Sequence, residues 1–567
     1  MASYVPAGHP GPHLDYPSAA TVGDVLAGSA RRYPDHVALR DGGLALTYAE
    51  LYDAARRLAT GLRERGVERG ETVALHLPNS AWFTVGYYGI LLAGAVVTPL
   101  NPSLPPTVLR DQLEESGAVA AMTHPTTIRA LAEAATPGLR LTVLAPPTAA
   151  APGPIPEEGS LPLGAASFDD LLRSTPIEER GVDADDLAHL SFTGGTTGRS
   201  KAVEVRHRNV VANAIQTACF RGAALPAVDE YGGVLLEPLA AGRNDHMTAP
   251  GEGRVVALAP LFHAMGLVSQ TGNVLAGAEV VIVGRFDPAR FLDTIESRAI
   301  TSLPGSPALF HALLAVPGVE QRDLSSVRVV NSGAAPIETA TLERLGRIFP
   351  NALVVEGYGL TEATMCLTLH PLEPGATPPG SVGAPVFDTE LTIHALGGGA
   401  ELPVGETGEV WARGPQITAG YRHHPELTRE QFVDGWLRTG DLGRLDADGW
   451  LYLVGRAKDM LIYKGYNVYP SPLEELLVRH PAVAQASVIG APDPEVGEIP
   501  VAFVVPAAEA VGTSELAEEL MAHVAERVAP YSRVREIVFV GALPTSAAGK
   551  VLKTELRARY ASEPASS

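Results

Sequence analysis

The sequence predicts an α/β fold with a large N-terminal domain, residues 1–455, and a small C-terminal domain, residues 456–567. The 567 residues exceed what one hydrophobic core usually serves, and 46% of them are hydrophobic. Helical segments alternate with short apolar strand-like runs, which is the pattern of α/β proteins. Near Gly455 a hairpin pattern gives way to a compact run of helices and strands, and this change places the boundary.

The first elements are read from hydrophobic periodicity. Tyr48 to Arg65 has a helical period, and Thr72 to Leu77 is a strand-like run. Val85 to Leu100 is the longest apolar stretch, but glycines interrupt it and it is too short to span a bilayer. We therefore expect it to form a buried helix that runs into a strand.

The most distinctive segment is Ser191 to Lys201, which reads Ser-Phe-Thr-Gly-Gly-Thr-Thr-Gly-Arg-Ser-Lys. Glycines let backbone N–H groups approach phosphate oxygens, threonine hydroxyls donate further hydrogen bonds, and a lysine supplies positive charge. Taken alone, the segment fits a nucleotide phosphate loop and a glycine-rich hairpin turn equally well.

The flanks of this loop exclude a Walker-type P-loop. Strands are expected at Leu187 to Phe192 and at Ala202 to Val205, and a helix only from Asn209, a good N-cap. A Walker loop needs four residues between its glycine and the Gly-Lys ending, followed directly by a helix. Here Gly194 and Gly198 are too close together, and Arg199 stands where the lysine belongs.

Two stretches lack a periodic pattern. Ala145 to Gly164 is rich in proline, alanine and glycine, which predicts an exposed connection. Arg221 to Gly253 is a second irregular stretch, interpreted as a surface insertion, with a substrate lid or a dimer contact as the alternative.

The boundary region begins with a hairpin. Trp436 to Val454 alternates around the turn Asp446-Ala447-Asp448-Gly449. In the C-terminal domain, Ser471 is predicted as an N-cap, with Pro472 at the first helical position and Glu474 closing a capping box.

The rest of the C-terminal domain is short. A second helix is expected from Ser514 to Val528 and a strand from Ile537 to Val540, before the loop that presents Lys550.

Charge and cysteine content exclude several classes. The formal net charge of −21 argues against a nucleic-acid or anionic-membrane binder. The two cysteines, Cys219 and Cys366, lack the spacing of metal ligands, and so few cysteines suit a reducing compartment. We expect both to be packed in the interior as small hydrophobic residues. The first residues show no signal peptide, so we expect a cytoplasmic protein, monomeric or homodimeric.

Further motifs follow in a fixed order: Leu46–Leu51, Pro260–His263, Ser332–Pro336, Glu356–Ala363, Gly408–Gly414, Gly435–Asp441, Gly455–Asp459 and Pro544–Lys550. Together with the glycine-threonine loop they resemble the adenylate-forming superfamily of acyl-CoA synthetases, amino-acid adenylation domains and beetle luciferases. The resemblance covers nearly the whole chain. It implies that a carboxylate is joined to ATP as an acyl-adenylate, with Mg²⁺, and then passed to a thiol such as that of coenzyme A.

The resemblance also implies roles for particular residues. The β- and γ-phosphates would be held by Thr193, Gly194, Gly195, Thr196, Thr197, Gly198 and Lys201. The adenine site would comprise Gly333, Ala334, Ala335, Glu356 and Gly357, with Tyr358 stacking on the ring.

The catalytic roles are carried over in the same way. Thr361 would bind the α-phosphate, and Glu362 would hold Mg²⁺, a hard cation that prefers carboxylate and phosphate oxygens. Asp441 would accept hydrogen bonds from both ribose hydroxyls, with Arg456 close by. Lys550 would bridge the incoming carboxylate and the α-phosphate.

His263 and three residues of the small domain complete the set. His263 resembles a residue that gates the acyl pocket, and a packed histidine bonded to backbone is the alternative. Lys458 occupies the family's hinge position. Rotation there would replace Lys550 with the Lys464-Gly465 loop, beside which a pantetheine arm could pass.

The phosphate loop departs from the usual pattern. Gly195, Ser200 and Ala202 replace the common serine, proline and glycine, while both threonines and the lysine remain. We expect activity and leave the nucleotide affinity open.

The substrate is expected to be a hydrophobic acid. Phe262-His263 lacks the acidic residue that amino-acid adenylation domains place there, and the candidate pocket from His263 through Ser306 and Gly359 to Met365 is apolar. A fatty acid, an arylpropenoic acid and a bulky polycyclic acid all fit. An acid–CoA ligase is the first hypothesis; a ligase loading a carrier protein, a luciferase-like oxygenase and a non-catalytic nucleotide-binding scaffold are the alternatives.

Overall fold

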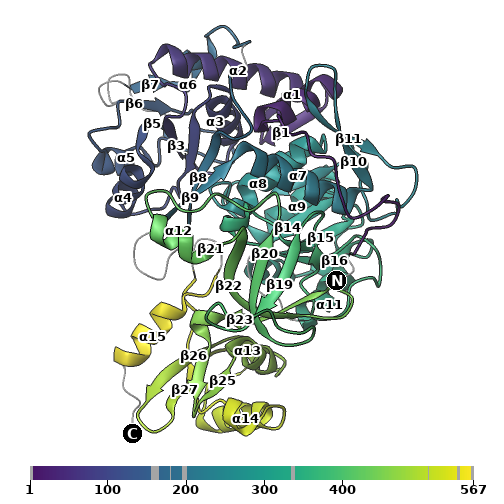
Figure 1. Cartoon of the computed structure of the whole chain (residues 1–567), viewed down its shortest axis with the longest axis vertical. Coiled ribbons are helices and arrows are strands. Elements are labelled where there is room, and N and C mark those ends of the chain that lie inside the picture. The colour runs from purple at the N-terminus through teal and green to yellow at the C-terminus, as the bar shows by residue number, and fades with distance from the viewer. Residues whose placement is uncertain are drawn as a thin grey trace.

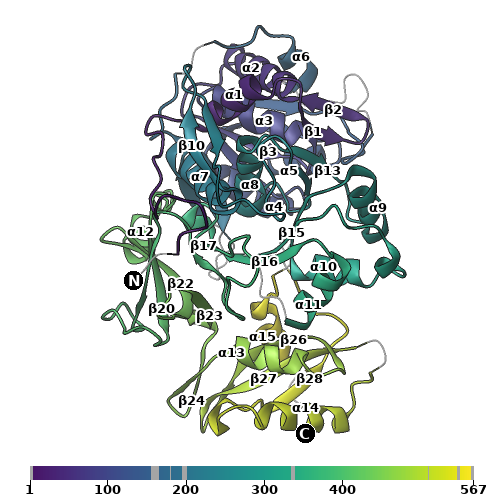
Figure 2. The same ribbon diagram turned by 90° about the vertical axis from the view of Figure 1, so that its right-hand side faces the viewer.

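The computed structural model describes residues 4–154, 165–178, 181–193, 201–333, 339–507, 510–545 and 550–562. It has a large N-terminal domain and a small C-terminal domain at one end of the long axis, as both ribbon views show (Figures 1 and 2). The predicted fold class is therefore confirmed.

Two large sheets form the body of the N-terminal domain. The seven-stranded sheet has the order β7-β6-β5-β3-β4-β8-β9, with bounds Ala165–Ser167, Leu141–Leu144, Ala118–Thr123, Thr72–His76, Val96–Pro99, Leu187–Thr193 and Lys201–Arg206. The nine-stranded sheet has the order β18-β17-β16-β15-β14-β12-β13-β1-β2, with bounds Ala384–Pro385, Thr368–Leu369, Leu353–Tyr358, Val329–Ser332, Ser302–Gly305, Arg254–Ala257, Glu279–Ile282, Val37–Asp41 and Leu44–Thr47. Most neighbouring strands run parallel, so their connections are helices.

Helices lie between the two sheets and on their outer faces. One core joins Val73 of β3 and Val280 of β13 to the central helices, which are α1 (Val22–Arg32), α2 (Tyr48–Glu64), α3 (Ala81–Leu92), α7 (His207–Gly222) and α8 (Ala264–Leu275). The outer helices are α4 (Pro106–Ser116) and α5 (Ile128–Ala134) over the first sheet, and α9 (Pro288–Arg298), α10 (Pro307–Leu314) and α11 (Thr339–Ile348) over the second. The short α6 (Phe168–Leu172) packs on α2. The strands are thus covered on both faces, as parallel strands require.

A third sheet and the small domain complete the chain. The third sheet contains β19 (Glu390–His394), β20 (Gly408–Arg413), β21 (Phe432–Val433), β22 (Trp436–Leu445) and β23 (Leu451–Arg456), with α12 (Pro425–Gln431) beside it. The C-terminal sheet contains β24 (Leu461–Tyr463), β25 (Tyr466–Val468), β26 (Val483–Asp493), β27 (Gly497–Pro506) and β28 (Glu536–Phe539). Its two faces pack against α13 (Pro470–Val478) and α14 (Ser514–Ala525), and against α15 (Lys553–Ser562).

Most predicted elements are confirmed within a few residues. They include α2, β3, the buried α3 that leads into β4, the strands β8 and β9 around the phosphate loop, the hairpin of β22 and β23, and α14 and β28. Cys219 and Cys366 are both buried and unpaired, as expected.

Two predicted helix starts are wrong. Helix α7 begins at His207, and Asn209 lies in its first turn, where its Oδ1 accepts the N–H of Arg206 at 3.0 Å. The chain leaves β9 at Arg206 and enters the helix at once, so no residue separates the two elements. Helix α13 begins at Pro470, which leaves Ser471 inside the helix, since the first turn tolerates proline.

Both irregular stretches differ from expectation. Residues 145–154 have no helix or strand, but Ala145, Ala150 and Ala151 are buried, so this part is not an exposed connection; residues 155–164 lie outside the described ranges. Arg221 to Gly253 contains a hairpin of β10 (Ala224–Val228) and β11 (Val234–Pro238). Strand β11 packs on α1 at Gly28, where a Cβ would lie 2.4 Å from the carbonyl oxygen of Val234.

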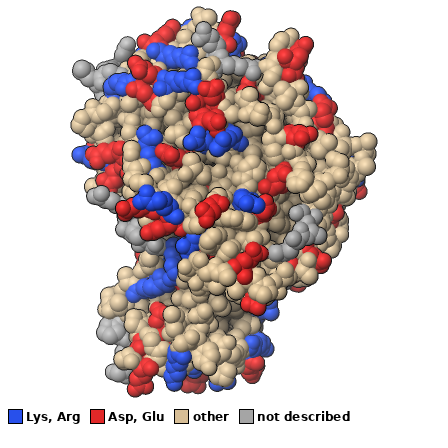
Figure 3. Space-filling view, viewed as in Figure 1, with Lys and Arg blue, Asp and Glu red and all other residues tan. Residues whose placement is uncertain are grey.

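The helices and the charged surface bear on the predictions about membranes and charged partners. Within the described ranges, every helix falls short of the length and apolar character that a membrane crossing needs. Acidic and basic side chains are interspersed on the face shown in Figure 3, and blue side chains gather at the waist between the domains.

Candidate active site

The phosphate loop connects two paired strands. Thr193 ends β8 and Lys201 begins β9, and these two residues are opposite one another in the antiparallel pair. The ammonium of Lys201 lies 5.7 Å from the ring centroid of Tyr421. The other predicted loop residues, Gly194, Gly195, Thr196, Thr197 and Gly198, lie outside the described residues.

Glu362 lies next to this loop base. It occupies the short 3₁₀ turn η2 (Thr361–Ala363), is 9% exposed, and its Oε1 accepts a 2.7 Å hydrogen bond from the Tyr421 hydroxyl. Burial and the Glu362 carboxylate raise the pKa of Tyr421, so this tyrosine stays a neutral donor. Thr361, the predicted α-phosphate ligand, is half-buried in the same turn.

Asp441 joins residues from three strands. Its Oδ2 accepts a 2.7 Å hydrogen bond from the Tyr358 hydroxyl at the end of β16, and its Oδ1 lies 3.0 Å from Nε of Arg456. Asp441 on β22 and Arg456 on β23 are opposite one another in the pair, so the sheet fixes this contact. A carboxylate has about four acceptor positions, so Asp441 can still accept hydrogen bonds from a ligand.

Lys550 brings the small domain to these groups. The surrounding protein desolvates its ammonium, and with Arg456 and Lys458 it lowers the pKa of Lys550, while Asp441 and Glu362 act in the opposite direction. Lys550, Arg456 and Lys458 all stay accessible to solvent. These three cationic side chains are partly desolvated by neighbouring protein but keep contact with solvent, as is expected at a site that substrates enter.

His263 is bonded to the backbone, as the alternative interpretation expects, and its role as a gate of the acyl pocket stays a prediction. It caps α8, where its Nδ1 accepts the backbone N–H of Met265 at 3.4 Å, which leaves the neutral proton on Nε2. Desolvation, together with the Lys550 ammonium, lowers the pKa of His263 to about 4. A backbone-bonded histidine therefore also lies within the field of Lys550, and it is neutral at pH 7.

The adenine-side residues lie on adjacent parallel strands. Ser332 of β15 and Glu356 of β16 are opposite one another, Gly333 follows Ser332, and a Cβ at Gly357 would lie 2.8 Å from the Leu369 side chain. Desolvation raises the pKa of the Glu356 carboxyl to about 7. The buried Oγ of Ser332 and Oδ1 of Asn331 have no hydrogen-bond partner among the described residues. Ala334 and Ala335 lie outside those residues.

The hinge and loop residues of the small domain are placed differently. Lys458 lies in η3 (Ala457–Asp459), and desolvation followed by the charge of Arg456 lowers its pKa. Lys464 and Gly465 form the two-residue turn of the β24–β25 hairpin, with φ of 50° and 84°. The backbone N–H of Lys464 donates to the carbonyl of Val496 at 2.8 Å, within the small domain, whereas Lys550 lies in the field of Arg456, Asp441 and Glu362.

The donor set fits Mg²⁺ bound mainly by a nucleotide. The described residues hold no group of three or more His, Cys, Asp and Glu side chains that could bind a metal by themselves. Glu362 offers one carboxylate oxygen beyond the one bonded to Tyr421. Mg²⁺ in nucleotide sites is commonly bound by one or two carboxylates and substrate phosphates, so a single carboxylate is sufficient.

Family models match two parts of the chain. The model of the AMP-binding enzyme matches residues 26–422, and that of the AMP-binding enzyme C-terminal domain matches residues 472–550. The chain belongs to the AMP-binding enzyme family. The resemblance of its motifs to adenylate-forming enzymes is confirmed.

Relatives and solved structures specify the reaction class. The chain is 34% identical over 536 residues to 4-coumarate–CoA ligase 5 of Oryza sativa subsp. japonica, covering 93% of this chain and 92% of that protein. It is also 34% identical over 523 residues to 4-coumarate–CoA ligase 3 of Arabidopsis thaliana, covering 91% and 87%.

Solved structures agree with these relatives. An anthranilate CoA ligase in complex with anthranoyl-AMP superimposes with a TM-score of 0.82 at 26% identity, covering 96% of this chain and 97% of the other. A benzoate CoA ligase from Burkholderia xenovorans gives 0.78 at 26% identity, covering 95% and 100%. The protein is an adenylate-forming acid–CoA ligase that uses ATP, Mg²⁺ and coenzyme A.

Residues outside the predicted set also build the site. Tyr421 was missed because nothing in the sequence around it signals a contact to Glu362. Asn209, Asn213 and Gln216 of α7 were missed as well, although polar residues at these spacings on an otherwise apolar helix are a readable signal.

Proposed function

We propose that the protein activates a hydrophobic carboxylic acid, with an arylpropenoic acid as the first candidate. The observation that carries the proposal is that Lys550 of the small domain lies in the field of Asp441, Arg456 and Glu362, which belong to β22, β23 and η2. The names of the relatives support an aromatic acid. Met265 and Met365, which belong to the stretch from His263 to Met365 that the sequence predicts as the acid pocket, support a hydrophobic one.

The proposed first step is formation of the acyl-adenylate. A carboxylate oxygen of the acid attacks the α-phosphorus, the bond to the bridging oxygen breaks, and pyrophosphate leaves. Lys550 lies between both reacting anions and offsets their charge, while Asp441 holds the ribose and Thr361 the α-phosphate. Glu362 would hold Mg²⁺, which would supply positive charge to offset that of the phosphate oxygens. Catalysis here is positioning and electrostatic stabilisation.

The proposed second step is thioester formation. The thiol sulfur of coenzyme A attacks the acyl carbonyl carbon and loses its proton, and AMP leaves. Lys550 must first withdraw from the acyl carbonyl. The small domain, which begins after residue 455, would therefore rotate at Lys458. This rotation would bring the Lys464-Gly465 turn to the site. The positive φ of both turn residues gives a tight hairpin tip that leaves room for a pantetheine arm.

The substrate is tested by acid-dependent pyrophosphate exchange over a panel of acids. We expect 4-coumarate and related arylpropenoic acids to support the fastest exchange, followed by medium-chain fatty acids, with malonate and amino acids inactive. Fast exchange with an amino acid and none with any hydrophobic acid would overturn the proposal. Offering a carrier protein as well as coenzyme A to the enzyme with purified acyl-adenylate tests whether the protein also loads a carrier protein.

A further inference from the structure

One face of helix α7 carries a row of polar side chains that the proposed chemistry does not use. This polar face consists of Asn209, Asn213 and Gln216, and Arg221 lies in the last turn of the same helix. The first three are at most 2% exposed. Buried amides are costly unless they are bonded, so their partners are informative.

Asn213 clamps the backbone just after the catalytic turn. Its Nδ2 donates to the carbonyl of Cys366 at 3.0 Å, and its Oδ1 accepts the N–H of Cys366 at 2.9 Å. The amide thus satisfies both backbone groups of one residue, as a neighbouring strand would. Cys366 lies four residues after Glu362, so the clamp fixes the far end of the segment that carries Glu362.

The segment between Glu362 and Cys366 is strained. Thr364 has φ 64° and ψ −57°, a conformation that non-glycine residues rarely adopt. Its Oγ1 donates to the carbonyl of Gln416 at 2.6 Å. Such a backbone persists only where surrounding contacts hold it, and Asn213 and Gln416 hold it from two sides.

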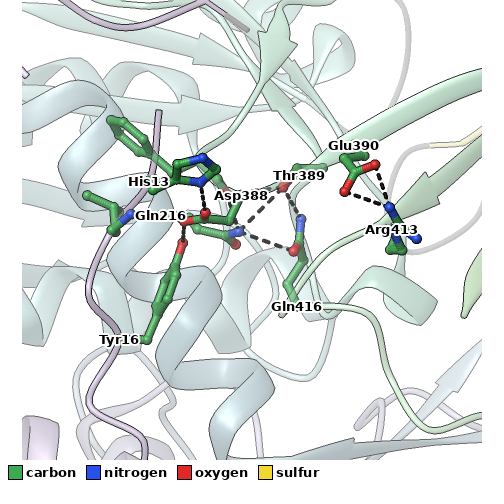
Figure 4. Close-up of polar contacts among 10 residues, drawn as sticks. His13, Tyr16, Gln216, Asp388, Thr389, Glu390, Arg413 and Gln416 are labelled. Carbon is green, nitrogen blue, oxygen red and sulfur yellow. Dashed lines mark hydrogen bonds and ion pairs between the residues drawn. The ribbon is translucent and has the colours of Figure 1, made fainter. Parts of the chain in front are cut away.

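Gln216 ties these two holders together. Its Nε2 donates to the carbonyl of Phe387 at 2.6 Å and to Oε1 of Gln416 at 3.1 Å, and Nε2 of Gln416 donates to Oγ1 of Thr389 at 2.7 Å. Figure 4 shows this group of side chains between α7 and the start of the third sheet, next to Asp388 and the N-terminal segment. All three of Gln216, Gln416 and Thr389 are buried.

Helix α7 also contacts two other parts of the site. One is the segment around Pro415 to Thr418, which bonds Glu362, and the other is strand β16. Asn209 donates to the carbonyls of Pro415 and Ile417 at 2.9 and 3.0 Å. The next residue, Thr418, donates from its N–H and Oγ1 to the carbonyl of Glu362. At the other end of the helix, Arg221 donates to the carbonyl of Glu356 at 3.2 Å.

We propose that the polar face of α7 positions the nucleotide half of the active site, with Asn213 as the positioning residue that orients Glu362 toward the metal. The proposal rests on the proposed role of Glu362 as the Mg²⁺ ligand. Asn213 touches neither substrate nor metal; it acts through Cys366 and the strained turn.

The test is the free Mg²⁺ concentration that gives half-maximal acid-dependent pyrophosphate exchange. Asn213→Ala should raise it about tenfold, the effect of losing about 1.4 kcal/mol of positioning. Thioester formation from preformed acyl-adenylate should stay near the wild-type rate, since it needs no ATP. Asn213→Asp keeps the shape and the acceptor oxygen but loses the N–H donor, so it should raise the Mg²⁺ midpoint by less than Asn213→Ala. It replaces the alanine variant in this test if that variant does not fold.

Asn79 offers a matched control. Its amide also bridges two backbone groups, donating to the carbonyl of Ala259 at 3.0 Å and accepting the N–H of Leu261 at 2.8 Å, but on the acid side of the site. Asn79→Ala should leave the Mg²⁺ midpoint at the wild-type value. An equal shift in Asn79→Ala and Asn213→Ala would mean general loosening and would overturn the proposal.

Glu362→Gln separates the two hypotheses. If it leaves the Mg²⁺ midpoint unchanged, the metal role in the proposed function is wrong. If it shifts the midpoint and neither Asn213 variant does, the positioning proposal is wrong. In the double variant with Asn213→Ala, the two shifts should not add, because both act on the same ligand.

Discussion

Single residues in this site owe their properties to surroundings that lie far away in the sequence. Glutamate side chains are usually exposed to solvent and ionised. The carboxyl of Glu356, on β16 beside β15, is desolvated, and this raises its pKa to about 7. His263 moves in the opposite direction, since desolvation favours its neutral form. At pH 7 His263 is therefore neutral, and the Glu356 carboxyl is protonated in about half of the molecules.

The raised pKa of Glu356 predicts a pH-dependent stability. Between the ordinary value of 4.5 and about 7 the folded chain binds a proton that the unfolded chain has lost, so the free energy of unfolding falls as pH rises through this window. Glutamine cannot ionise. Glu356→Gln should match the wild type near pH 4 and exceed its unfolding free energy by up to about 3 kcal/mol at pH 8.

Chemical unfolding of the nucleotide-free protein at both pH values checks this prediction. An unfolding free-energy difference between variant and wild type that is the same at pH 4 and pH 8 would show that the carboxyl keeps its ordinary pKa.

Lys550 gives a second prediction at this scale. Lys550→Ala should reduce acid-dependent pyrophosphate exchange at least a hundredfold, because it removes the ammonium that the proposal places between the two anions. Thioester formation from preformed acyl-adenylate should persist. Lys553→Ala is the control, since its Nζ pairs with Glu474 at 2.8 Å inside the small domain and should leave exchange unchanged. Exchange that survives in Lys550→Ala would refute the assignment.

At the scale of elements, local sequence signals predicted whether a segment is a helix or a strand better than they predicted the residue at which it begins. The capping box of Thr47 and Glu50 starts α2 as its residues indicate, with the Glu50 N–H donated to Thr47 Oγ1 at 3.2 Å. At α7 and α13 the same kind of signal misled, because the preceding strand or turn delivers the chain to the helix two residues earlier.

The hairpin of β10 and β11 illustrates a tertiary contact that no local pattern reveals. It packs where Gly28 of α1 leaves room, since a Cβ at Gly28 would lie 2.4 Å from the carbonyl oxygen of Val234. Gly28→Ala should therefore lower the unfolding free energy by about 1–3 kcal/mol despite the better helix propensity of alanine.

Gly272 of α8 is the matched control for that variant. A Cβ there would meet nothing closer than the Thr217 hydroxyl at 3.8 Å, so Gly272→Ala should raise the unfolding free energy by about 0.5–1 kcal/mol. Thermal and chemical unfolding of both variants measure the contrast. Equal effects of the two substitutions would contradict the packing argument.

At the scale of the whole molecule, the loop that carries Lys550 reaches the third sheet. Arg456 and Asp441 pair across β22 and β23 of that sheet, and Lys550 of the small domain lies in their field. The N-terminal segment adds a long-range tie, since His13, Leu14 and Tyr16 all bond the carboxylate of Asp388, as Figure 4 shows for the two labelled side chains.

Rotation at Lys458 is tested by fixing its backbone. Proline restricts φ, so Lys458→Pro should keep pyrophosphate exchange and lose thioester formation with coenzyme A. Lys458→Ala removes the same charge but keeps backbone freedom, so it should retain both reactions. Loss of thioester formation in both variants would assign the effect to the charge and refute the hinge.

The sequence by itself determined the family, the α/β class, most element types and the order of the motifs, because hydrophobic period and turn chemistry are local. It also named Glu362, Asp441, Arg456 and Lys550 as candidates. Only the tertiary structure decided that Lys550 lies in the field of the other three, that Tyr421 bonds Glu362, and that Asn213 clamps Cys366. These contacts connect residues 59 to 153 positions apart or lie between domains, and such pairings follow from packing and desolvation, which no local pattern contains.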